Sequence, residues 1–215
     1  MKQLLFCSFI SICLFFSVNS ELQSQESKKV LLFIRDGSGD LDYTLKAEVG
    51  VMEQMLEQSG LTVVIATVSG QPLITESVHI TPDLKLIDVD IANYSGFILP
   101  CMHAGVSSEI VNPHAVRMFK EVILAKKPIA VQHAAISILA NAGVLQGINY
   151  TFHVEIDTIR YPEFKGGVYS GTSVVRDGNI ITSGVCPYLA MLYGLDDGTE
   201  QLTKSLIMAI NEGTK

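Results

Sequence analysis

The sequence predicts an α/β protein built as a three-layer sandwich, with helices on both faces of a mainly parallel sheet. Apolar runs of strand length alternate along the chain with segments whose apolar residues recur at helical spacing. This alternation is typical of parallel strands that are linked by helices. With 215 residues, 48% of them apolar, the chain is long enough to bury a core without covalent support.

The first residues predict a signal peptide rather than part of the fold. Lys2 supplies a positive charge, an apolar run follows from Leu4 to Val18, and Val18 and Ser20 occupy the two positions that a signal peptidase inspects. The run is shorter than the roughly 20 apolar residues of a membrane span, which favours cleavage. We therefore expect a signal peptide at 1–20, a disordered lead-in at 21–28 and one domain at 29–213. The mature protein would be secreted or periplasmic, with no membrane partner.

The predicted elements begin with a buried strand at 29–36 and a helix at 43–58, which Gly60 terminates. After them we expect a strand at 61–68, an edge strand at 73–80, a strand at 96–100, a helix at 107–126, a strand at 128–132, a helix at 134–142, strands at 168–176 and 179–183, and a last helix at 188–212.

Charge and cysteine content narrow the possible partners. The formal charge is −7 and becomes more negative once Lys2 is removed, and Lys and Arg form no cluster. These features argue against nucleic acid and anionic membranes as partners. Only Cys101 and Cys186 remain after the predicted cleavage. They can form one disulfide bond, or they can be one reactive thiol and one buried apolar side chain.

A candidate site lies where the predicted strands end, because ligands of open α/β sheets bind at the carboxyl ends of the strands. Three such ends, at 36–42, 100–105 and 132–135, gather more reactive side chains than any other part of the chain. These side chains are Asp36, Asp40, Asp42, Cys101, His103 and His133.

Four segments carry a family resemblance that covers residues 29–210. They are Val30–Asp36 with the acidic loop after it, Tyr94–Pro100, the unbroken stretch Lys127–Gly143, and Val175–Ser183. In this order they resemble the ThiJ/PfpI (DJ-1/PfpI) superfamily, which is related to class I glutamine amidotransferases. The resemblance implies a flavodoxin-like or glutamine amidotransferase-like fold and a homodimer. It also implies hydrolase, amidase or deglycase activity from a cysteine on a sharp strand-to-helix turn, the nucleophile elbow, and a nearby glutamate.

The sequence departs from the family pattern at the functional positions. Aligned without gaps, the elbow cysteine of the family falls on His133, and the histidine after it falls on Ala134. The family's catalytic glutamate falls on or near Gly39, with Asp40 beside it. The two glycines after the proline of the earlier strand fall on Cys101 and Met102. Whether the protein is an enzyme is therefore left open.

Three interpretations follow from these departures. In the first, the domain has a degenerate elbow, is non-catalytic, and is either empty or binds a small ligand, with Cys101 packed in place of glycine. In the second, a relocated Cys101–His133 dyad, oriented by Asp36 or Asp40, hydrolyses or hydrates a small carbonyl or amide-type compound. In the third, Cys101, His103 and His133 bind zinc together with an aspartate. No other cofactor is expected.

Overall fold

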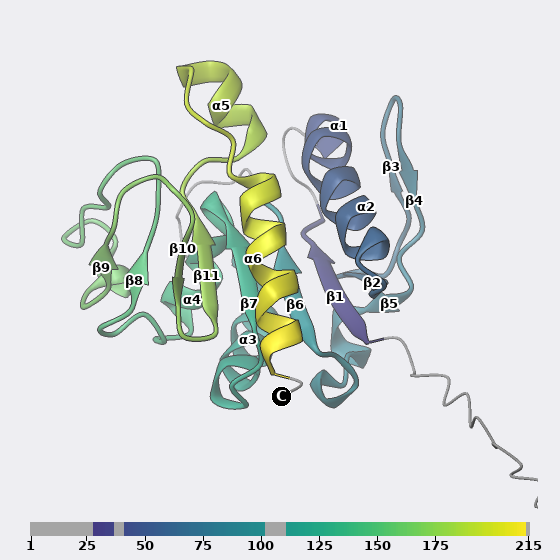
Figure 1. Cartoon of the computed structure of the whole chain (residues 1–215), viewed down its shortest axis with the longest axis horizontal. Coiled ribbons are helices and arrows are strands. Elements are labelled where there is room, and N and C mark those ends of the chain that lie inside the picture. Colours follow the sequence, from purple (N-terminus) through teal and green to yellow (C-terminus); the bar gives the residue numbers. More distant parts are fainter. Residues whose placement is uncertain (1–27, 37–40, 102–110, 214–215) are drawn as a thin grey trace, which may run out of the picture.

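A seven-stranded sheet forms the centre of the molecule (Figure 1). The computed structural model describes residues 28–36, 41–101 and 111–213. The strand order is β10-β11-β7-β6-β1-β2-β5, and every neighbouring pair is parallel except β10 with β11. The predicted fold class is therefore confirmed.

The main sheet consists of β1 (Lys29–Ile34), β2 (Thr62–Thr67), β5 (Leu84–Lys85), β6 (Gly96–Leu99), β7 (Ile129–Gln132), β10 (Val175–Asp177) and β11 (Ile180–Ser183). Two small sheets pair β3 (Leu73–Ile74) with β4 (His79–Ile80), and β8 (Asn149–Tyr150) with β9 (Val168–Tyr169). The α-helices are α1 (Leu41–Thr44), α2 (Gly50–Gln58), α3 (Pro113–Leu124), α4 (Ile136–Asn141), α5 (Pro187–Tyr193) and α6 (Thr199–Glu212). The shorter helical turns are η1 (Leu45–Val49), η2 (Leu86–Asp88), η3 (Ile91–Asn93), η5 (His133–Ala135) and η6 (Pro162–Phe164).

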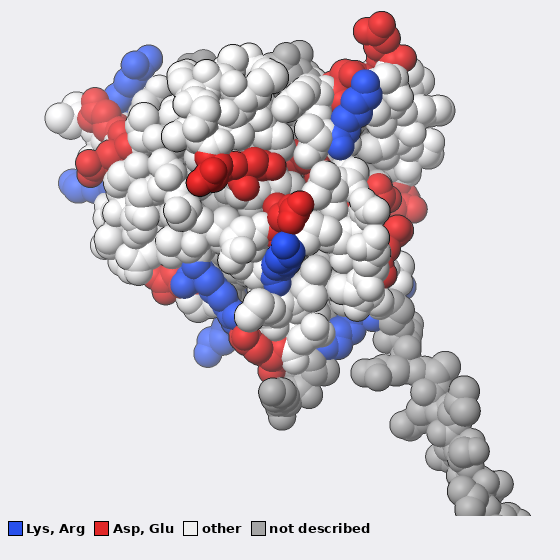
Figure 2. Space-filling view, turned by 45° about the horizontal axis from the view of Figure 1, so that its top comes forward, with Lys and Arg blue, Asp and Glu red and all other residues white. Residues whose placement is uncertain are grey.

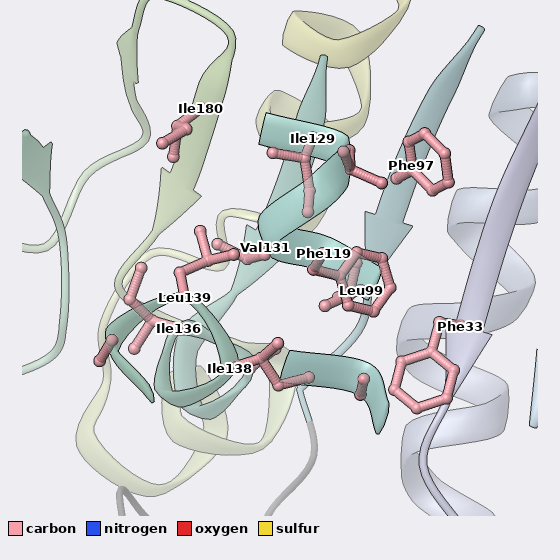
Figure 3. Packing of buried hydrophobic residues seen from close by; sticks show 14 of the residues in the cluster. Phe33, Phe97, Leu99, Phe119, Ile129, Val131, Ile136, Ile138, Leu139 and Ile180 are labelled. Carbon is pink, nitrogen blue, oxygen red and sulfur yellow. The ribbon is translucent and has the colours of Figure 1, made fainter. Parts of the chain in front are cut away.

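Each face of the sheet is covered by its own helices, because successive strand residues point to opposite faces. Leu31 and Phe33 of β1 belong to the core that includes α3 and α4, whereas Leu32 belongs to the core that includes α2 and α6. Figure 3 shows the first of these cores, in which the Phe119 ring of α3 lies 5.6 Å from that of Phe33. The apolar strands are therefore buried on both sides.

The sheet edge differs from the prediction. The segment 73–80 does not join the main sheet but folds into the β3–β4 hairpin. Its place at the edge is taken by β5, which pairs with the end of β2 through Ala66 and Leu84. Two residues of pairing give too short an alternating pattern to be recognised in the sequence.

Several element boundaries also differ. The predicted helix at 188–212 is two helices, because Gly194 adopts a left-handed φ of 63° and ends α5. The helix predicted from residue 107 begins at Pro113, where the Asn112 side chain accepts hydrogen bonds from the first backbone N–H groups. Residues 107–110 lie outside the described part. The strand predicted at 168–176 is split into β9 and β10.

The predicted signal peptide and all of the lead-in except Lys28 lie outside the described residues. Among the residues that are described, no helix is long and apolar enough to cross a membrane. On the face seen in Figure 2, acidic and basic side chains are scattered among uncharged ones, and no broad basic surface gathers there.

Candidate functional site

Three reactive side chains meet at the carboxyl ends of the parallel strands, where β6, β7 and β11 end side by side. Cys101 follows β6, His133 follows β7 and Cys186 follows β11. Their ligand atoms all lie within 4.8 Å of one another, and the three residues are 3%, 8% and 1% exposed. The structure thus brings together the predicted pair, Cys101 and His133, and adds a second cysteine to it.

His133 occupies the corner between β7 and the helical turn that leads into α4. Its φ of 41° lies in the left-handed region, which is uncommon for a residue with a side chain. Backbone strain of this kind is concentrated at functional sites. The imidazole is held on its face by Phe152, whose ring is stacked at 4.2 Å. The corner therefore fixes both the position and the plane of the ring.

Both ring nitrogens of His133 have partners. Nδ1 lies 3.4 Å from the Cys101 Sγ, and Nε2 lies 2.8 Å from Nδ1 of His153. When the ring proton is on Nε2, it is donated to His153, and Nδ1 is left to accept the thiol proton of Cys101. Burial lowers the pKa of His153, and the neighbouring His133 lowers it further. A neutral His153 is the acceptor that this arrangement needs.

Cys186 is the residue that precedes α5, and the arrangement around it favours the thiolate. Its pKa lies well below the ordinary value for a thiol, first because the Cys101 side chain hydrogen-bonds to it and then because His133 and the Leu189 N–H do so. Burial opposes these effects. Two proton arrangements therefore connect these three groups: with the His133 proton on Nε2 the Cys101 thiol donates to Nδ1, and with a proton on Nδ1 both His133 and the Cys101 thiol donate to the Cys186 thiolate. The two cysteines do not form a disulfide bond.

Glu48 brings a buried carboxyl group to the same site. It lies in η1, a π-helical turn within the helical stretch 41–58, and is 2% exposed. Turns of this type recur at functional sites. Its Oε1 accepts the backbone N–H of Cys101 at 2.5 Å. Burial raises the pKa of Glu48 well above its ordinary value, and the negative charge of Cys186 raises it further.

Of the two carboxylates predicted to orient the imidazole, only Asp36 is described, and its recorded side-chain contact is with another part of the sheet. The Oδ2 of Asp36 accepts the backbone N–H of Ser69, at the end of a different strand. The partner of the His133 Nε2 is His153. Asp40, with Gly39 beside it, and the proposed metal ligand His103 lie outside the described residues.

Sequence reasoning did not assign three of the participants to the site, for different reasons. Glu48 lies between Leu45 and Met52 on the apolar stripe of its helix, and an acid in that place was a usable signal. Cys186 follows a strand end, so the rule that drew attention to Cys101 applied to it as well. His153 lies in a connection outside the main sheet, and the sequence pattern gave no sign of its role.

A small pocket borders the loop that carries Cys186. It has a volume of about 330 Å³ and is lined by residues 172–174, 194–198 and Gln201. The Gly198 N–H is bonded to the carbonyl of Val185, the neighbour of Cys186. This volume lies at the lower end of the range for small-molecule pockets, about 300–1,000 Å³.

Comparison with known proteins agrees with this architecture. The pattern that defines the DJ-1/PfpI family matches residues 28–192. This chain therefore belongs to the DJ-1/PfpI family.

The relatives and structural neighbours extend this result. An uncharacterized protein of Archaeoglobus fulgidus is 32% identical over 133 residues, which are 60% of this chain and 75% of that protein. The structure resembles a ThiJ/PfpI domain protein of Brachyspira murdochii with a TM-score of 0.66 and 14% identity, over 86% of this chain and 98% of that one. It also resembles Drosophila melanogaster DJ-1beta with a TM-score of 0.60 and 23% identity, over 87% of this chain and 97% of that one. At these identities the structural likeness shows the fold alone.

Proposed function

We propose that this DJ-1/PfpI-like protein carries out thiol chemistry on small carbonyl or amide-type compounds, using Cys101 and His133 as a pair relocated from the usual elbow. The observation that carries the proposal is the 3.4 Å contact between the Cys101 Sγ and His133 Nδ1. A thiol beside a fixed imidazole is the usual arrangement of an activated cysteine nucleophile. The low exposure of both residues restricts the substrate to a small molecule.

The first chemical step follows from this contact. His133 Nδ1 takes the thiol proton, and the Cys101 sulfur forms a bond to the carbonyl carbon of the substrate. The π electrons of the carbonyl move to its oxygen, which then receives the proton from His133. With an aldehyde the product is a hemithioacetal, and atoms and charges balance without another reactant. Glu48 accepts the Cys101 N–H, and its raised pKa favours the neutral form, so it supplies a second candidate proton donor beside this residue.

The test compares alkylation of Cys101 by iodoacetamide across pH in the wild type and in His133→Ala. General-base assistance contributes about 10²–10⁴-fold, so the variant should react at least tenfold more slowly at neutral pH. His79→Gln, an exposed histidine in β4, is the matched control and should react like the wild type. The same proteins are assayed for glyoxalase, deglycase and peptidase turnover. Unchanged alkylation in His133→Ala, or turnover that survives Cys101→Ser, would contradict the proposal.

The imidazole at the corner after β7 supports a second candidate function. A histidine is a poorer nucleophile than a cysteine at a sharp turn before a helix, so the elbow would be degenerate and the domain would bind a small ligand without turnover. Thermal stabilisation by small carbonyl compounds, with no product formed and no dependence on Cys101, would favour this candidate over the thiol enzyme.

Export is a separate part of the proposal. The positive, apolar and small-residue order of residues 1–20 supports cleavage and release outside the cytoplasm. N-terminal sequencing of the protein after expression with its full leader tests it. A mature chain that begins at or near Glu21 is the expected result, and an intact N-terminus in the cytoplasmic fraction would contradict it.

A further inference from the structure

The ligand atoms of Cys101, His133 and Cys186 converge on one small volume. They come from three neighbouring strand ends and lie within 4.8 Å of one another, although their residues are far apart in the sequence. Two sulfurs and one imidazole nitrogen are soft and borderline donors, which suit zinc and not the oxygen-seeking cations Ca²⁺ and Mg²⁺. The donor set therefore defines the class of ion before any distance is considered.

The distance between the Cys101 sulfur and the His133 nitrogen fits a tetrahedral ion. With Zn–S about 2.3 Å and Zn–N about 2.0 Å, the sulfur and nitrogen of a tetrahedral site lie about 3.5 Å apart. Cys101 Sγ and His133 Nδ1 are separated by 3.4 Å. An ion can therefore replace the shared proton with little movement of these two side chains.

The surroundings supply the outer contacts that metal-binding histidines require. Such a histidine normally donates its second ring N–H to a nearby acceptor, which fixes the nitrogen that faces the metal. Here His133 Nε2 lies 2.8 Å from His153 Nδ1, so Nδ1 is the nitrogen that faces the sulfurs. Phe152 stacks on the ring, and Ala134 and Val185 add an apolar wall around the cysteines.

Charge balance selects a divalent ion. Two thiolates and a neutral imidazole carry two negative charges in a buried place, and burial of uncompensated charge is costly. A dication cancels both charges, whereas Cu(I) leaves one negative charge. The Glu48 carboxyl group is already engaged by the Cys101 N–H and is not needed as a ligand.

We propose that Cys101, His133 and Cys186 form a three-ligand zinc site whose fourth position is open to water or a small ligand. This site differs from the one predicted from the sequence, because Cys186 is a ligand and His103 is not required. Zinc binding displaces the thiol proton of each cysteine that is still protonated. It therefore competes with the thiol chemistry proposed above, and the proposal does not rest on that chemistry.

The test uses the whole chain, prepared free of metal with a chelator and a reductant and then titrated with Co²⁺ and Zn²⁺. We expect one equivalent of Co²⁺ to give the ultraviolet thiolate-to-cobalt charge-transfer band and the visible bands of a four-coordinate ion. Zinc should abolish these bands by displacement. Absence of the charge-transfer band in folded wild-type protein would overturn the proposal.

The variants separate the three ligands from their surroundings. Cys101→Ser, His133→Ala and Cys186→Ser should each remove or strongly shift the cobalt spectrum, and His79→Gln should leave it unchanged. His153→Gln alters only the outer contact and should weaken zinc binding about 10–100-fold. An unaltered spectrum in Cys186→Ser would refute the assignment.

Because some variants can fail to fold, a second test measures cysteine alkylation in the wild type alone, with and without zinc. Zinc should protect Cys101 and Cys186 from alkylation together, and chelator should reverse the protection. Equal alkylation rates with and without zinc would contradict the site. Failure of the thiol chemistry would appear differently: the metal-free protein would show no turnover, yet the same preparation would give the cobalt bands after Co²⁺ is added. The two proposals can therefore fail separately.

Discussion

Asp42 and Glu48 lie six positions apart in one helical stretch, yet their surroundings change their acidity in opposite directions. Asp42 is 38% exposed, and its carboxylate accepts hydrogen bonds from the hydroxyl groups of Thr75 and Ser77 and from the Ser77 N–H. The bonds from Ser77 and Thr75 hold the pKa of Asp42 well below its ordinary value. A charged Asp42 thereby fastens the β3–β4 hairpin to the start of the helix.

Glu48 is removed from water, and within the described part of the chain its carboxyl group accepts a hydrogen bond from the backbone N–H of Cys101. Desolvation penalises the charged form more than this bond favours it, so the pKa rises. The comparison teaches that donors and solvent, not helix position, decide whether a carboxylate is a structural anchor or a neutral acid at a reactive site.

The largest expected effect comes from removing the buried carboxyl group. Glu48→Ala leaves the Cys101 N–H without its acceptor and should lower the free energy of unfolding by about 1–3 kcal/mol. Glu48→Gln keeps a carbonyl acceptor and should lose much less. Urea denaturation measures both, with Glu57→Ala on the exposed face of the same helix as the control. A Glu48→Ala protein as stable as the control would show that the bond is unimportant.

The pH dependence of Glu48→Gln tests the raised pKa. The native state keeps the Glu48 proton above pH 4.5, where the unfolded chain releases it, so this group makes the wild type less stable as pH rises towards the folded pKa. Gln has no proton to lose. In metal-free protein, we therefore expect the free energy of unfolding of Glu48→Gln to increase relative to that of the wild type as the pH rises from 4.5 towards the folded pKa. Parallel stability curves would contradict a buried neutral acid.

Asp42→Asn should show the opposite sign and the smallest effect. Because the folded pKa is below the model-peptide value of 3.8, Asp42 stabilises the protein above that pH, and the contribution is lost as the solution is acidified. The variant should be slightly less stable than the wild type at neutral pH and equally stable once the solution is acidic enough to protonate Asp42 in the folded protein. Asp88→Asn, at an exposed position in η2, is the control. A deficit that persists in acid would mean that hydrogen bonding alone, not charge, holds the hairpin.

Much of the fold was predictable, because the information is local. The run Val30–Ile34 is apolar at every position, as a strand covered on both faces must be, and Gly60 marks the end of its helix. Predictions failed where neighbours in space decided the outcome. Residues 73–80 were predicted as an edge strand but form a separate hairpin, and β5 pairs with β2 instead. The last helix was predicted as one but is two, because Gly194 is left-handed.

The site was only partly predictable for the same reason. The strand-end rule found Cys101 and His133 because parallel strands bring their carboxyl ends to one edge, which is a property of the whole fold class. Asp36 obeyed the same rule but faces the end of β2, where it accepts the Ser69 N–H. Proximity along an edge is thus set by strand order, which the sequence pattern did not give.

The sequence by itself determined the layers, the parallel sheet and the edge at which reactive groups gather, since hydrophobic burial depends on residue spacing along each element. Only the tertiary structure decided which groups touch. Glu48 meets Cys101 across 53 positions, Cys101 meets His133 across 32, and His133 meets His153 across 20. Contacts over such separations depend on the direction of each side chain and on the exclusion of water. Those conditions exist only after the layers have packed, and they also set the acidity of Glu48 and His153.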